Sequence, residues 1–139
     1  HDIGKKEIDQ EILQKPRMQM SRQELEIYEG HAMKGMEILA GVQGITEDIR
    51  QIVGQHHENC LGTGFPFHLN KHKILPLARL VSVANEFSKH IIKGPQTTVA
   101  MRPKDAIRQL KLFPDRFDGD FIKSLERIIK SNENTDDED

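Results

Sequence analysis

Four places along this chain carry side chains whose types suit metal binding: His1 with Asp2, His31, the pair His56–His57, and Asn85. Neutral imidazole and carboxylate oxygen are common ligands of zinc, manganese and iron. Consecutive residues on a helix point about 100° apart, so the imidazoles of His56 and His57 should fan outward. That arrangement suits two metal ions side by side better than one closed tetrahedral site.

Not every histidine needs a functional explanation. His31 alone indicates little, because one histidine beside an apolar face is more often a packing or surface residue, although Gly35 would let another helix approach its imidazole. The pair indicates more, since two imidazoles beside apolar residues need polar partners. Cys60 follows His57 at a zinc-binding spacing, but it is the single cysteine, and we interpret it as a free thiol. The remaining histidines are interpreted as solvated: His68, His72 and His90.

A glycine-rich turn, "GTGFP", follows the histidine pair directly. Gly62 and Gly64 can adopt positive φ without steric cost, and Pro66 stiffens the exit of the turn. One interpretation is a tight turn that ends a helix. The other is a loop whose N–H groups meet a phosphate or base, with Phe65 as a stacking surface.

The elements that must position these residues are helices. Helical spacing of apolar residues predicts helices within residues 20–41, 45–57, 75–92, 102–113 and 117–130. Ser21 with Glu24 forms a predicted capping box, and Thr46 is a predicted N-cap. Pro76 and Pro103 stand at predicted first turns. Residues 1–16 should contain a helix end and an irregular connector, and loops are expected at about 58–74 and 92–101.

The pattern therefore predicts an all-α fold, because no stretch alternates at period two. The helix at 75–92 should bury an apolar stripe of Leu77, Leu80, Val81 and Ala84, with Asn85 as a buried, hydrogen-bonded amide beside it. The last helix should begin at Asp118 and bury Phe121, Leu125, Ile128 and Ile129. We expect one domain over residues 1–130, followed by an acidic disordered tail over 131–139.

Composition limits the function classes. The net charge is −2, and without the five acids of the tail the body has 20 basic against 17 acidic residues, a charge near +3. This charge suits an anionic ligand and is too small to indicate DNA binding. The single cysteine fits a reducing cytoplasm, and no run is long and apolar enough to span a membrane. Because the chain begins at His1, we expect it to be a fragment.

The motifs together resemble the HD-GYP domain, a branch of the HD-domain metal-dependent phosphohydrolases. The resemblance is carried, from His1 to about Ile129, by "HDIGK" at 1–5, "GHAMKGMEIL" at 30–39, "HHENCLGTGFP" at 56–66 and "ARLVSVANEF" at 78–87. It implies an HD-domain-like helical bundle that holds a cluster of two or three metal ions, commonly iron or manganese. Such domains hydrolyse the bacterial signalling molecule cyclic di-GMP to linear pGpG or GMP.

The resemblance also assigns roles by position. His1, Asp2, His31, His56 and His57 match metal ligands, with Asp2 as the bridging carboxylate. Lys5 matches a lysine near the scissile phosphate, and Arg79 matches an arginine that reaches a phosphate. The loop that borders the ligand corresponds to Gly62, Gly64, Phe65 and Pro66.

The chain departs from the family pattern at several of these positions. A further histidine, often with a glutamate, lies upstream of the HD pair in the family, and nothing precedes His1 here. The family has acids where this chain has Leu61, Asn85 and Ser88, and a tyrosine where it has Phe65. We expect the imidazoles to hold one metal ion, for example a zinc or nickel ion acquired adventitiously. We do not expect them to balance the charge of a catalytic cluster of metal ions.

Two functions follow from this comparison. The first is a degenerate HD-GYP-like module of a bacterial signalling protein, which binds a cyclic dinucleotide, a phosphorylated nucleotide or a partner protein without turnover. The second is an active metal-dependent phosphodiesterase, with Asp2 and Lys5 in the catalytic machinery. The retained histidines disfavour a purely structural helical domain.

Overall fold

The helices are those of a computed structural model, which describes residues 1–95 and 97–136. Along the chain they are η1 (Ile3–Glu7), α1 (Gln10–Gln14), η2 (Arg17–Gln19), α2 (Arg22–Glu29), α3 (His31–Ala40), α4 (Glu47–Gln55), α5 (Pro76–Ile91), α6 (Pro103–Lys111) and α7 (Gly119–Asp136). The described residues form no strand beyond two isolated bridges, Leu61 with Asn70 and Gly94 with Thr97. The predicted all-α fold is confirmed.

Several predicted helix ends are confirmed by their hydrogen bonds. The Ser21 hydroxyl accepts from the N–H of Glu24 while the Glu24 carboxylate accepts from the N–H of Ser21, which completes the capping box. Thr46 accepts from the N–H of Ile49 at 3.4 Å. Pro76 and Pro103 occupy the first turns of α5 and α6, where a missing N–H has no cost.

One expected helix is two helices. The sequence predicted a single helix within 20–41, but α2 ends at Glu29 and α3 begins at His31, with Gly30 between them. Glycine disfavours continuous helix because its unfolded backbone has more freedom to lose. The irregular start is likewise resolved into short elements, η1, α1 and η2, rather than one helix end and a connector.

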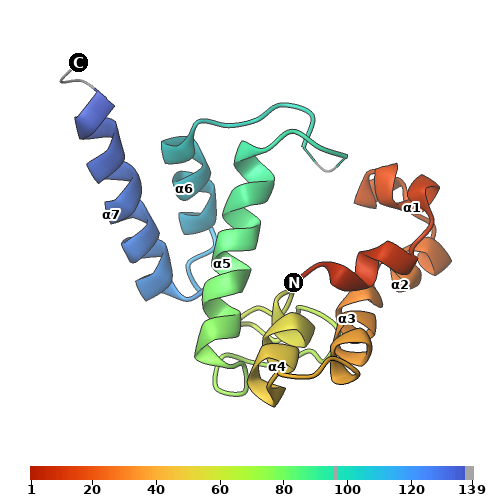
Figure 1. The fold of residues 1–139 in the computed structure, drawn as a ribbon. Coiled ribbons are helices and arrows are strands. Elements are labelled where there is room, and N and C mark those ends of the chain that lie inside the picture. The colour runs from red at the N-terminus through yellow and green to blue at the C-terminus, as the bar shows by residue number, and fades with distance from the viewer. Residues whose placement is uncertain (96, 137–139) are drawn as a thin grey trace.

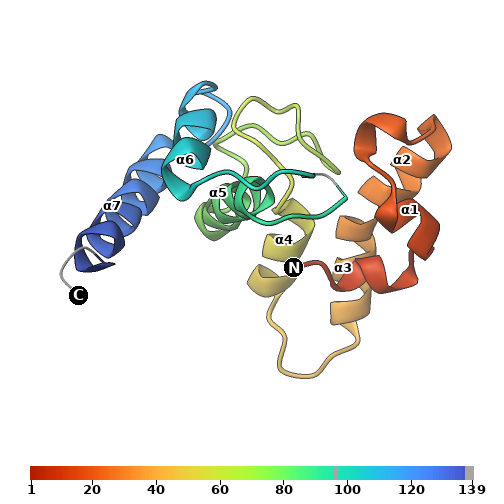
Figure 2. The ribbon, with the colours of Figure 1, turned by 90° about the horizontal axis from the view of Figure 1, so that it is seen from above.

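The long helix α5 divides the molecule (Figure 1). On one side α6 and α7 pack against it around a core of Val83, Ile107, Leu110, Phe117 and Ile122. On the other side α4 joins α5 to α3, and η1 lies against α3. Seen from above, α5 lies between the two C-terminal helices and the N-terminal elements (Figure 2).

The prediction of which α5 residues are buried is wrong. Leu77 is 58% exposed and Leu80 is 41% exposed, whereas the buried residues are Ala78, Ser82 and Val83. α5 has neighbours on two sides, since the Ser82 hydroxyl donates to the carbonyl oxygen of Glu58 in the 58–74 loop and Val83 belongs to the C-terminal core. In α7, the predicted residues Phe121, Leu125 and Ile129 are partly buried and pack against the C-terminal core. Ile128 is exposed, contrary to the prediction, and Ile122 is buried instead.

The C-terminal helix continues beyond the predicted domain boundary at residue 130. Helix α7 runs to Asp136, so residues 131–136 are helical rather than the start of a disordered tail. The rest of the expected tail, 137–139, lies outside the described residues. Among the described helices, none has the length and apolar character to traverse a bilayer.

Candidate metal centre and cavity

Four side chains from distant parts of the sequence converge beside α4. Asp2, His31, His56 and His57 each offer one ligand atom, and these atoms all lie within 4.8 Å of one another. Asp2 precedes η1, His31 begins α3, and the histidine pair directly follows α4. Gly4 allows this convergence, because a Cβ there would lie 2.0 Å from the carbonyl oxygen of His31.

Backbone carbonyls orient two of the imidazoles. His31 Nδ1 lies 2.5 Å from the carbonyl oxygen of Tyr28, and His56 Nδ1 lies 2.6 Å from that of Val53. Both carbonyls are near helix ends, where the last turn has no intrahelical donors for its oxygens. A carbonyl can only accept, so each Nδ1 carries the proton and each neutral ring has its lone pair on Nε2.

These lone pairs point at one another. The Nε2 atoms of His31 and His56 are 3.3 Å apart, and each lies 3.4 Å from Asp2 Oδ1. Three acceptor atoms at this spacing repel unless a cation lies between them. With metal–ligand bonds of about 2.1 Å, two ligands of a tetrahedral ion are roughly 3.4 Å apart, so the spacing fits one metal ion.

Two buried atoms of the cluster also lack hydrogen-bond partners. Asp2 Oδ1 and His57 Nε2 are buried and make no hydrogen bond with any described residue. Buried polar atoms are ordinarily paired, and a bound cation would satisfy both. On this observation the donor set fits a divalent metal ion.

The protonation states suit metal binding. Burial, followed by the neighbouring His56, holds the pKa of His57 far below its usual range, and burial lowers the pKa of His56 despite its contact with Asp2. Burial by itself would raise the pKa of Asp2, but contacts with His31, His56 and Lys5 outweigh it and keep that pKa well below normal. At neutral pH the pair is therefore neutral and Asp2 ionised, the forms that bind metals.

His1 and Lys5 lie at the edge of the cluster. His1 Nε2 is 3.6 Å from Asp2 Oδ2 and its ring centroid is 4.7 Å from that of His56, but it is not one of the four converging donors. The ammonium of Lys5 donates to Asp2 Oδ2 at 2.8 Å. Lys5 therefore holds Asp2 and adds positive charge beside it.

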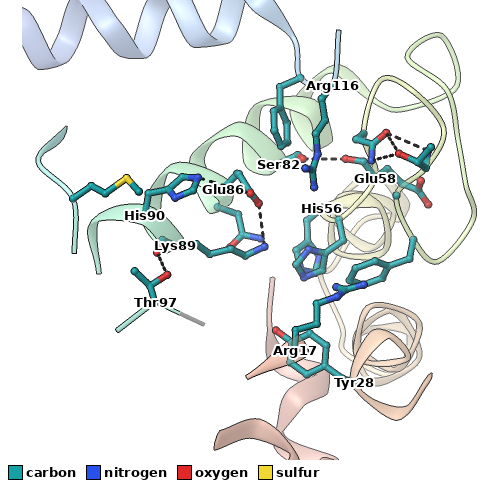
Figure 3. A pocket seen from close by; sticks show the side chains of 18 of the residues that line it. Arg17, Tyr28, His56, Glu58, Ser82, Glu86, Lys89, His90, Thr97 and Arg116 are labelled. Atoms are coloured by element: carbon teal, nitrogen blue, oxygen red, sulfur yellow. Dashed lines mark hydrogen bonds and ion pairs between the residues drawn. The ribbon is translucent and has the colours of Figure 1, made fainter. Parts of the chain in front are cut away.

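The cluster borders a cavity of about 620 Å³ (Figure 3). The histidine pair, Gly64 and Phe65 form one wall, α5 contributes Asn85, Glu86 and Lys89, and Arg17 and Arg116 come from other segments. Gly62 and Pro66 are not among the residues that line it. Gly62 has φ +75°, as predicted, whereas Gly64 is required by close approach: a Cβ there would lie 2.4 Å from the His57 carbonyl oxygen.

The wall beside His57 is a stack of planar groups. The centroid of the Phe65 ring lies 4.4 Å from that of the His57 ring, at an interplanar angle of 24°. The guanidinium of Arg17, which is on η2, lies 5.2 Å from the centroid of the Phe65 ring. Glu58, which the sequence analysis did not single out, supports this loop. Its carboxylate accepts from the N–H groups of Phe67 at 2.6 Å and Leu69 at 2.9 Å.

Comparison with known proteins identifies the family. The family model for the HD domain matches residues 1–121. The chain belongs to the HD domain family. The cyclic di-GMP phosphodiesterase PA4108 of Pseudomonas aeruginosa is 26% identical to this HD domain over 129 residues, which are 93% of the chain and 31% of the relative.

Other relatives agree on the branch. The 3'3'-cGAMP-specific phosphodiesterase 2 of Vibrio cholerae is 32% identical over 73% of the chain and 20% of its own length. The solved structure of Bd1817, an HDG"Y"P protein from Bdellovibrio bacteriovorus, matches with a TM-score of 0.74 and 26% identity, covering 94% of this chain and 40% of that one. The predicted HD-GYP-like domain is confirmed, and the chain spans a third or less of the length of these two curated relatives.

The HD domain does not place Arg79 where the sequence predicted. Its Nε donates to Asp118 Oδ2 at 2.9 Å, and its Nη1 donates to the carbonyl oxygens of Ile74 at 2.8 Å and Lys71 at 3.0 Å. It is not among the residues that line the cavity. The guanidinium is used to join the 58–74 loop and α5 to the start of α7, so the expectation of phosphate contact is not supported.

The other departures from the family pattern fall in different places. Asn85 is half-buried and lines the cavity, and no hydrogen bond of its amide is found among the described residues, contrary to the buried structural amide expected. Ser88 lines an adjoining hollow that also contains Asp2 and Lys5. Leu61 is 56% exposed and lies outside the cavity lining.

The remaining polar candidates behave mostly as expected. His68 and His72 are exposed, but His90 is half-buried, lines the cavity and lies 4.0 Å from Glu86, so the solvated interpretation is wrong for His90. Burial raises the pKa of the Cys60 thiol. Cys60 is outside the metal cluster and is a free cysteine, as predicted.

Proposed function

We propose that this HD domain binds a cyclic dinucleotide, or a related phosphorylated nucleotide, beside one divalent cation, and that it has lost most hydrolytic activity. One observation supports the proposal above the others. The donor atoms of Asp2, His31 and His56 face one another at metal-ligand spacing, and His56 and His57 line a cavity large enough for a nucleotide.

The residues divide the work of binding. Asp2, His31 and His56 would hold the cation, with His57 beside them, and such a cation neutralises charge on phosphoryl oxygens and activates water. Lys5 keeps Asp2 in place and adds positive charge near the phosphate. Phe65 offers an aromatic face at the cavity wall, on which a base can stack.

The charge of the donor set favours a single cation. The cluster has one carboxylate and three imidazoles. Where the family has acids, α5 has the neutral Asn85 and Ser88 at the cavity and the adjoining hollow, and its one carboxylate in the cavity lining, Glu86, is paired with Lys89. Two divalent ions would leave a large uncompensated positive charge at a buried site. A donor set rich in nitrogen suits zinc, nickel or iron more than the oxygen-seeking manganese.

Metal loading and nucleotide binding test the proposal together. The chain is loaded separately with Zn²⁺, Ni²⁺, Fe²⁺ and Mn²⁺, its metal content is measured, and cyclic di-GMP and 3'3'-cGAMP are titrated by calorimetry with product analysis by chromatography. We expect about one metal per chain, nucleotide binding that requires the metal, and no appreciable product. A chain that binds neither metal nor nucleotide contradicts the proposal.

An active phosphodiesterase is the second candidate, favoured by the retained contact between Lys5 and Asp2. It predicts turnover of about 1 s⁻¹ or faster in the metal-loaded chain. Asn85→Asp separates the two candidates, because it restores a carboxylate to the cavity wall. If the loss of that charge caused the loss of activity, the variant binds a second metal and yields product, whereas the unaltered chain does neither.

A further inference from the structure

A cyclic dinucleotide has two phosphates, and only one of them would lie at the metal cluster. We infer that Arg116, which none of the sequence motifs include, binds the other phosphate. The inference rests on the proposed function, since it assigns a second anion-binding position in the same cavity. Arg116 thereby takes the phosphate-binding role that the sequence assigned to Arg79, which does not line the cavity.

Charge pairing within the cavity singles out Arg116. Three arginine and lysine side chains line it: Arg17, Lys89 and Arg116. Arg17 forms an ion pair with Glu29, and the Lys89 ammonium lies 3.3 Å from the Glu86 carboxylate. Among the described residues, Arg116 has no carboxylate within 4.0 Å, so its charge is available to a ligand.

The acidic lining residue Glu58 does not compensate Arg116. Both carboxylate oxygens of Glu58 accept backbone N–H groups of the 58–74 loop, those of Phe67 and Leu69. Its backbone carbonyl accepts the hydroxyl of Ser82 at 3.0 Å. Glu58 is therefore committed to the loop, and its exposed fraction is only 1%.

The backbone of Arg116 is held in place before any ligand arrives, and its side chain is exposed. Its N–H donates to the Phe113 carbonyl at 3.0 Å, and its carbonyl accepts from Cys60 N–H at 2.8 Å, so its backbone is tied to the loop that follows the histidine pair. Its guanidinium lies 5.3 Å from the ring centroid of Phe117, a buried core residue. A backbone that is already ordered lowers the entropic cost of binding.

The placement suits a ligand with two phosphates. In the view of Figure 3, Arg116 enters the cavity from the side opposite Arg17, with His56 between them. A phosphate at the metal cluster would leave Arg116 facing a different part of the ligand. The guanidinium fork binds phosphate oxygens in pairs, which an ammonium cannot do.

Titrations with two nucleotides test the assignment. Metal-loaded Arg116→Gln is compared with the unaltered chain for binding of cyclic di-GMP, which has two phosphates, and GMP, which has one. We expect the affinity for cyclic di-GMP to fall about tenfold or more, while affinities for GMP and for the metal change less than about twofold. Arg116→Lys should give an intermediate loss.

Arg127→Gln is the matched control, because it removes the same charge from an exposed site on α7 outside the cavity. Unchanged cyclic di-GMP binding in Arg116→Gln, or equal losses for both nucleotides, overturns the assignment and leaves the proposed function standing. An unaltered chain that binds no cyclic dinucleotide overturns both.

Discussion

The protons of two imidazoles are placed by the main chain. Tyr28 and Val53 supply carbonyls to Nδ1 of His31 and His56, which leaves both Nε2 lone pairs facing Asp2. The residue types were readable from the sequence because imidazole and carboxylate have few chemical uses together. The partner carbonyls were not readable, since they depend on where helices end.

Replacing a ligand should remove stabilisation by metal. Metal at 100 times its dissociation constant stabilises a protein by about 2.7 kcal/mol, which raises Tm by roughly 10 °C in a domain of this size. We expect chelator to lower the Tm of the zinc-loaded chain by that amount and to leave His31→Gln unchanged, as measured by calorimetry.

His72→Gln is the control, because His72 is exposed and outside the cluster. It should respond to chelator as the unaltered chain does. A chelator effect of full size in His31→Gln would contradict the assignment of this ligand, whatever the intrinsic stability of the variant.

Among the elements, the contact between η1 and α3 brings Asp2 to His31. Helical spacing predicted most long helices, but it did not predict the break at Gly30 or the exposed stripe of α5. The first depends on one residue within an otherwise helical pattern. The second depends on which neighbours cover α5, and helical periodicity carries no information about a polar cavity on one side of a helix.

Gly4→Ala should separate η1 from α3. The added Cβ would lie 2.0 Å from the His31 carbonyl oxygen and 2.7 Å from Gly35 N, both backbone atoms, so η1 must move. We expect a loss of about 2 kcal/mol in the free energy of unfolding, measured with urea, and at least tenfold weaker zinc binding because Asp2 moves with η1.

Gly119→Ala is the matched control, since a Cβ there meets no atom within 4 Å. Its stability should stay within about 0.5 kcal/mol of the unaltered chain. If Gly4→Ala binds zinc as tightly as the unaltered chain, the close approach of η1 is not required for the metal centre.

In the whole molecule, a buried ion pair joins the C-terminal helices to the half that contains the metal cluster. Asp118 precedes α7 and its side chain is 7% exposed, while Arg79 on α5 also binds two carbonyls of the 58–74 loop. The resemblance predicted the HD-GYP-like domain and included the four residues whose donor atoms converge in the cluster. It did not predict this ion pair, because the sequence indicated only that Asp118 begins the last helix.

Asp118→Asn should destabilise the protein in a pH-dependent way. Burial opposes ionisation, but the N–H of Asp120 and the charges of Lys71 and Arg79 outweigh it and lower the pKa of Asp118. A carboxyl group whose pKa is lower in the folded state stabilises that state at pH values above its unfolded-state pKa of about 3.9. This stabilisation is lost as the pH falls through the folded-state pKa. We expect a loss of roughly 3 kcal/mol at pH 7.

Urea unfolding from pH 7 to pH 3 measures this difference, which should shrink toward the acid end. Asp120→Asn is the control, because its side chain is 87% exposed and its N–H contact with Asp118 is retained. A deficit for Asp118→Asn that is independent of pH would mean that packing, and not charge, accounts for the loss.

The carbonyl partners of His31 and His56 have a consequence for the history of such sites. A substitution at Tyr28 or Val53 would change the side chain and keep the carbonyl that orients the ring. The orientation of these rings should therefore tolerate mutation of their partner residues. An ancestral cluster can lose its acids one after another and still present aligned imidazoles. Affinity for a metal ion should therefore outlast catalysis when an enzyme of this kind becomes a receptor.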